Sequence, residues 1–107
     1  MNVLIVEPGK NPIPAEIENT LEAKQKLVGG LIEMVTPVQH HDDAVLICNE
    51  EGKINGLEPN RLLCFEDGNP YDVICGKFFI CRAPSDSEDF AGLTENQMKT
   101  YSAMYSL

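Results

Sequence analysis

Two short, uninterrupted apolar runs constrain the fold of this chain more than any other feature of its sequence. Residues 3–6 and residues 44–48 contain only aliphatic side chains, one alanine and one cysteine. Runs of this length are too short for a buried helix and are typical of strands that are covered on both faces. We therefore expect a sheet that holds both runs in its interior.

Turn residues and apolar alternation predict further strands. They are expected over residues 13–18, 31–38, 71–75 and 77–82. Prolines favour an edge position for the first of these, and Gly76 predicts a bulge or bend between the last two. Residues 56–63 predict a loop that leads into a short helical turn, because Pro59 suits the first position of a helix.

A first helix is predicted over residues 20–28. Asn19 or Thr20 is expected to cap it, with Asn19-x-x-Glu22 as a capping box, and two glycines end it. Its spacing predicts a buried face made by Leu21, Leu27 and Val28, while charged residues such as Lys24 face solvent.

A second helix is predicted at the C-terminal end, where Thr94 and Gln97 have capping-box spacing. A stripe of Met98, Tyr101 and Tyr105 should pack either on the chain's own sheet or on another subunit. We favour the sheet, since a sheet of apolar strands needs cover on each face. We expect an α+β fold with a single, mostly antiparallel or mixed sheet, one helix in the N-terminal half and one C-terminal helix. The chain is expected to be a single domain, residues 1–107, with a core over 1–82, an acidic linker over 83–93 and the helix over 94–105.

Negative charge is concentrated in the middle of the chain. The sequence has 17 acidic and 8 basic residues, a net charge of −9, and residues 33–72 carry −7 of it. This balance disfavours direct binding to nucleic acid or anionic membranes. Three acidic turns contain Asp42, Asp43, Glu50, Glu51, Glu66 and Asp67. If these turns share one end of the sheet, they form a partner-binding face for a basic protein; otherwise they are ordinary solvated turns.

A second set of polar residues suggests a different role. Lys53, Asn55, Asn60 and Arg61 lie in the segment richest in polar, turn-forming residues, and with Lys10 they could supply hydrogen-bond donors to a small ligand such as a nucleotide. Alternatively, Arg61 fixes a loop through a pair with a carboxylate.

The sequence offers little for catalysis. Its cysteines, Cys48, Cys64, Cys75 and Cys81, lack Cys-x-x-Cys spacing, and three of them follow isoleucine, as buried cysteines do. Adjacent His40 and His41 have diverging side chains, which favours an exposed loop over a metal site. Phosphate-binding glycine loops and nucleophile motifs are also missing. We expect no catalytic residue, no metal and no cofactor.

The N-terminal apolar run is short and no basic stretch precedes it. We therefore expect neither a secretory signal nor a membrane span, and a cytoplasmic location.

Several segments together resemble the family of domain of unknown function 3846. They are residues 6–10, 27–33, 49–53, 56–57, 60–61, 72–76 and 78–80, in that order. The resemblance covers about residues 1–92, and in several members a helix like 94–105 follows. It implies a small protein of bacteria, phages, plasmids or integrative elements, often encoded near anti-restriction proteins, with no known activity or cofactor.

These observations lead to two functional hypotheses. The first is a non-enzymatic interaction protein of a phage or mobile element that inhibits or modulates a host nucleic-acid-binding enzyme, such as a nuclease of a restriction or CRISPR system. The turn carboxylates would then occupy the partner's basic channel. The second is a small-molecule or nucleotide-binding module. The sequence leaves the oligomeric state open.

Overall fold

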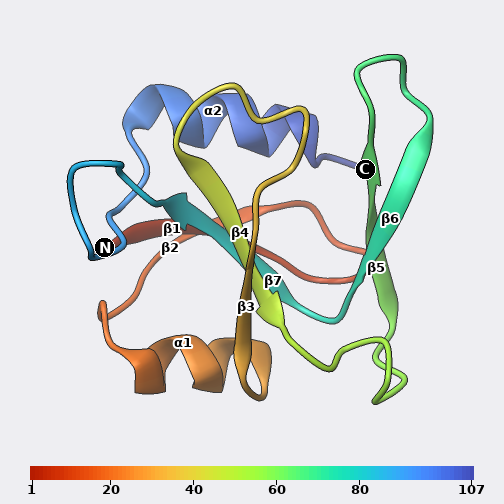
Figure 1. Cartoon of the computed structure of the whole chain (residues 1–107), viewed down its shortest axis with the longest axis horizontal. Helices are drawn as coiled ribbons and strands as arrows, with labels where there is room; N and C mark the ends of the chain where they lie inside the picture. Colours follow the sequence, from red (N-terminus) through yellow and green to blue (C-terminus); the bar gives the residue numbers. More distant parts are fainter.

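A five-stranded antiparallel sheet runs through the middle of the molecule (Figure 1). In the computed structural model, which describes residues 1–107, its strands are β1 (Asn2–Val6), β2 (Ile13–Glu16), β3 (Ile32–Val35), β4 (Ala44–Asn49) and β7 (Phe78–Arg82). Their order is β2-β1-β7-β4-β3, and every neighbouring pair is antiparallel. Each of the two apolar runs thus lies between two other strands, and β2 lies at an edge, as predicted. β3 is shorter than the predicted strand over 31–38.

Two further strands form a separate hairpin beside the main sheet. β5 (Pro59–Cys64) and β6 (Pro70–Cys75) pair only with each other, so the expected single sheet is in fact two. The helical turn predicted over 56–63 is wrong, because Pro59 is the first residue of a strand, where a missing amide hydrogen is tolerated. Gly76, at φ 86°, turns the chain from β6 into β7.

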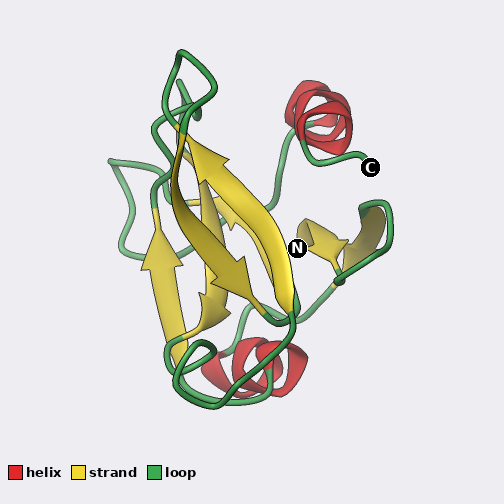
Figure 2. Ribbon diagram, turned by 90° about the vertical axis from the view of Figure 1, so that its right-hand side faces the viewer, coloured by secondary structure: helices red, strands yellow, loops and turns green.

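The two helices cover opposite faces of the five-stranded sheet, α1 (Leu21–Val28) on one side and α2 (Glu95–Met104) on the other (Figures 1 and 2). Alternate residues of β4 face the two layers. Leu46 belongs to the core cluster that contains Tyr101 of α2, whereas Ile47 belongs to the cluster that contains Val28 of α1. This arrangement confirms the α+β class and the two predicted helices. Neither helix has the length and apolar character needed to cross a membrane.

α1 is capped by Thr20, one of the two predicted residues, but the predicted capping box from Asn19 is wrong and its buried face differs. Thr20 alone is the cap, and its hydroxyl accepts from an amide 3.1 Å away. Asn19 instead donates to the carbonyl oxygen of Phe90 (2.7 Å) and accepts from Nζ of Lys24 (2.7 Å). Lys24 is 5% exposed and Leu21 is 57% exposed, the reverse of the prediction. The lysine buries its aliphatic stem while its ammonium group is bound by Asn19 and lies over the Phe90 ring.

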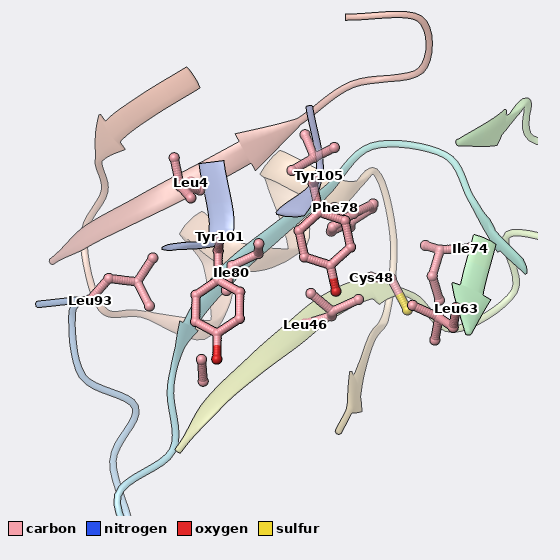
Figure 3. Close-up of a cluster of buried hydrophobic side chains, with 12 residues drawn as sticks. Leu4, Leu46, Cys48, Leu63, Ile74, Phe78, Ile80, Leu93, Tyr101 and Tyr105 are labelled. Carbon is pink, nitrogen blue, oxygen red and sulfur yellow. The ribbon is translucent and has the colours of Figure 1, made fainter. Parts of the chain in front are cut away.

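α2 docks on the chain's own sheet, as predicted. The capping box between Thr94 and Gln97 is present, and both tyrosines of the stripe are buried. Figure 3 shows Tyr101 and Tyr105 among side chains of the sheet, together with Leu63 and Ile74 from the hairpin. The hairpin therefore shares its core with α2 and packs on the same face of the sheet.

Candidate functional site

The three acidic turns do not form one patch. Asp42 and Asp43 directly precede β4, whereas Glu50 and Glu51 directly follow it. At about 3.3 Å per residue, the strand separates the two pairs by roughly 20 Å. The third pair lies in the β5–β6 turn, which contacts the loop before β4. Two of the predicted turns are thus brought together, and the Glu50–Glu51 turn is left at the opposite end of the sheet.

Asp42 and Asp43 are engaged within the protein. Asp42 accepts hydrogen bonds from the Tyr101 hydroxyl (2.6 Å), the amide of Ala44 (2.9 Å) and Nε2 of Gln97 (3.1 Å). Partial burial works to raise the pKa of Asp42, but these hydrogen bonds hold it below its ordinary value. Asp43 accepts from Gln97 and pairs with an arginine. Both carboxylates anchor α2 and the end of the sheet, which leaves them fewer free lone pairs for a partner.

Exposed aromatic and acidic side chains gather around the β5–β6 turn. We call this the hairpin-tip surface and define it as Val38, Phe65, Glu66, Asp67 and Tyr71. Phe65 is 48% exposed, Val38 42% and Tyr71 37%. The Phe65 and Tyr71 rings contact each other, with centroids 4.7 Å apart and planes tilted by 36°. An exposed aromatic pair beside carboxylates has the composition of a protein interface more than that of a solvated turn.

Within the hairpin-tip surface, the β5–β6 hairpin is bound to the loop between β3 and β4, which contains Val38. Three contacts do this: the amide of Val38 donates to the Tyr71 hydroxyl (3.1 Å), Nε2 of Gln39 donates to the carbonyl oxygen of Phe65 (3.1 Å), and Nε2 of His41 lies 3.1 Å from Oε1 of Glu66. Of this surface the sequence predicted only Glu66 and Asp67, because the other residues come from two segments that only the tertiary fold joins. The exposed apolar residues beside an acidic turn were its only local signal.

The predicted ligand donors are dispersed. Asn60 donates to the carbonyl oxygens of Val6 and Gly76, each at 2.9 Å. Arg61 donates to the carbonyl oxygens of Tyr105 (2.9 Å) and Lys10 (2.6 Å). Both side chains tie distant segments of backbone together. Arg61 does fix loops, but through carbonyl groups and not through the expected carboxylate.

A cleft of about 340 Å³ lies between the β3–β4 side of the sheet and β6. Of the predicted donors only Lys53 lines it, and its ammonium group binds the Asp72 carboxylate. This contact raises the pKa of Lys53 and lowers the pKa of Asp72. Glu33 and Glu50 also line the cleft. The surplus of carboxylates disfavours an anionic ligand such as a nucleotide at this position.

The cysteines are free thiols. Burial raises the pKa of Cys48 to about 11 and that of Cys81 to about 12, so both are protonated and poor nucleophiles at neutral pH. Cys75, predicted to be buried like these two, is only partly buried, as is Cys64.

His40 is the clearest departure from its prediction as an exposed loop residue. It is 7% exposed, and its ring lies against Tyr101 with centroids 4.3 Å apart. The neighbouring His41 does face solvent, as predicted. Contact with the Tyr101 ring and a hydrogen bond with the Tyr105 hydroxyl explain the burial of His40, and both tyrosines lie far away in the sequence.

The fold and surface describe a small α+β protein whose antiparallel sheet carries a helix on each face and a hairpin with an exposed aromatic tip. The chain belongs to the family described as Domain of unknown function (DUF3846), whose model matches residues 1–106. No curated protein and no solved structure matches it.

Proposed function

We propose that this protein is a non-enzymatic interaction protein that binds a basic surface of another protein. The observation that carries the proposal is the imbalance of unpaired charge. Among the seventeen acidic residues, three pair with a lysine or arginine, which leaves fourteen carboxylates without such a partner. Such a surface attracts positively charged partners and speeds their encounter.

The basic residues do not offset this field. Six of the eight lysines and arginines make ion pairs or side-chain hydrogen bonds within the chain, and only Lys26 and Lys99 do not. Few cationic side chains are therefore free to contact a partner, and the net charge of the chain is −9.

The partner class follows from the chemistry of the surface. Proteins that bind nucleic acid present lysine and arginine along a channel that tracks a phosphate backbone. Carboxylates held on a rigid fold can occupy such a channel in place of phosphates. We propose that the partner is a host nucleic-acid-binding enzyme such as a defence nuclease, which the protein inhibits or modulates in the cytoplasm. The resemblance to proteins of phages and mobile elements supports this setting.

The proposal is tested by affinity capture from a bacterial lysate, with identification of the retained proteins. Partners should be retained at about 50 mM salt, released at about 500 mM, and displaced by duplex DNA, because screening and DNA both remove the attraction. Replacing Glu50 and Glu51 by glutamine should reduce retention. Replacing Lys26 and Lys99 by glutamine, which also removes two charges, should not reduce it. The proposal is contradicted if the retained proteins are released by neither salt nor DNA. It is also contradicted if no protein is retained at low salt.

The second candidate is a small-molecule or nucleotide-binding module, for which the cleft at Lys53 offers a volume of about 340 Å³ but a lining whose carboxylates disfavour an anionic ligand. Thermal unfolding with a panel of nucleotides separates the two candidates. A nucleotide at 100 times its Kd stabilises the folded state by about 2.7 kcal/mol. The interaction-protein proposal expects no such stabilisation.

A further inference from the structure

We infer that the hairpin-tip surface receives an arginine side chain from a basic segment of the partner protein. This inference rests on the proposed function and adds the position and the chemistry of the contact. It depends on three features of the surface, which are its aromatic platform, its carboxylates and its rigidity.

The aromatic platform is the pair formed by Phe65 and Tyr71. Both rings are partly exposed although they contact each other, so part of their surface remains open to a ligand. A guanidinium group stacks on such a surface through its delocalised charge and keeps its edge free to donate hydrogen bonds. Exposed Val38 extends the platform for the aliphatic stem of the same side chain.

Glu66 and Asp67 provide the carboxylates. They directly follow Phe65 in the turn, where successive Cα atoms are about 3.8 Å apart, so they border the platform. The amide and the side-chain nitrogen of Asn69 each donate to Asp67 across 3.0 Å, which orients this carboxylate. No lysine or arginine of the chain pairs with either acid. A guanidinium stacked on the rings can therefore form a charge-assisted hydrogen bond at its edge.

The surface is also held in place before a partner arrives. The turn is closed by backbone hydrogen bonds from Phe65 to the Asn69 carbonyl (2.8 Å) and from Gly68 to the Phe65 carbonyl (2.9 Å). The contacts of Val38 and Gln39 then fasten the turn to the neighbouring loop. A preorganised surface loses little conformational entropy on binding, which favours it over the other acidic segments as the contact point.

Lysine is the weaker fit for this surface. Its ammonium group is a compact, strongly hydrated charge that does not stack in a plane. The inference therefore predicts that arginine binds better than lysine, whereas attraction by net charge alone would not distinguish them.

The test is a titration of the full-length, nitrogen-15-labelled protein with the blocked tripeptide acetyl-glycyl-arginyl-glycine amide, followed by amide chemical shifts. The lysine peptide and the uncharged citrulline peptide serve as comparisons. Shifts should be confined to the amides around Val38, Phe65–Asn69 and Tyr71, and they should be largest with arginine.

Asp67→Asn should weaken binding by about threefold, the size expected for one exposed ion pair, and the matched variant Asp86→Asn should leave it unchanged. Phe65→Ala should remove the preference for arginine over lysine, provided that its spectrum shows a folded protein.

The outcomes separate this inference from the proposed function. The hairpin-tip surface is not the arginine site if the citrulline peptide causes the same shifts as the arginine peptide. The same conclusion follows if Asp67→Asn and Asp86→Asn have equal effects on binding. If arginine peptides then bind elsewhere with salt sensitivity, the proposed function still stands. If a deca-arginine peptide fails to bind anywhere at low salt, both are overturned.

Discussion

The Tyr105 hydroxyl and Nε2 of His40 share a hydrogen bond of 2.8 Å, although 65 residues separate the two in the sequence. The other ring nitrogen, Nδ1, lies 2.8 Å from the carbonyl oxygen of Ala44, which can only accept. The imidazole must therefore carry a proton on Nδ1, and in the neutral ring Nε2 accepts from the Tyr105 hydroxyl. Through this ring the last turn of α2 is joined to the loop that leads into β4.

Protonation of His40 should destabilise the protein. Burial lowers the pKa of His40 from its ordinary value of 6.5, and this effect outweighs the opposing ones of the Ala44 carbonyl and Asp42. Because the unfolded chain then binds the proton more readily, stability is complete above about pH 6.5. It falls by up to about 1.4 kcal/mol per pH unit as the pH drops toward the lowered pKa of the folded state.

Urea unfolding at several pH values between about 7.5 and 5 measures this loss. The loss in this window should disappear in His40→Gln and remain in His41→Gln, the matched change at the exposed neighbour. Asp42 does not interfere, because its pKa is lowered and its contribution is lost only at more acidic pH. Equal slopes for wild type and His40→Gln would contradict the assignment.

The hydrogen bond from Tyr101 to Asp42 should contribute measurably to the docking of α2. Tyr101→Phe keeps the buried ring and removes the hydroxyl that lies 2.6 Å from Oδ1 of Asp42. We expect a loss of about 1–2 kcal/mol in the free energy of unfolding, because the acceptor is charged. Urea unfolding of Tyr101→Phe, Asp42→Asn and the double variant gives the coupling between the two groups. Additive losses would show that the contact contributes nothing of its own.

Gly76 should tolerate alanine less well than Gly9, although both have positive φ. At Gly9 a Cβ atom would meet nothing within 4 Å, so alanine there costs only backbone strain of about 1–2 kcal/mol. At Gly76 the Cβ atom would lie 2.7 Å from Cδ1 of Leu57, which adds a packing cost and brings the loss to about 2–4 kcal/mol. Thermal unfolding compares the variants, and Leu57→Ala in the Gly76→Ala background should recover part of the difference. Identical losses at the two glycines would refute the packing argument.

The thiols should react in two groups. Cys64 and Cys75 are partly exposed, whereas Cys48 and Cys81 are buried with raised pKa values. In the native protein at about pH 8, a coloured aromatic disulfide reagent should modify the first two quickly and the others only after unfolding. Serine at Cys75 should remove one equivalent from the fast phase, and serine at Cys81 should not change that phase. A single fast phase of four thiols would be inconsistent with the core described here.

Much of the fold could be predicted because its signals are local. The capping box of α2 needs only two residues that are three positions apart, and uninterrupted apolar runs predict the interior strands. The tyrosine stripe of α2 was predictable for the same reason, since helical periodicity places its members on one face. The candidate site was only partly predictable. Glu66 and Asp67 could be selected as acidic turn residues. The aromatic pair of Phe65 and Tyr71 could not be predicted, because it is formed by a contact across the hairpin.

The secondary elements with strong local patterns, the α+β class and the excess of negative charge all follow from the sequence alone. Three features depend on the folded chain: β5 and β6 form their own hairpin, Lys24 and His40 are buried, and only some acidic turns lie near each other. The physical reason is that caps and periodicity act between neighbours along the chain. The burial of a polar side chain depends instead on partners that are often distant in sequence, such as Tyr105 for His40.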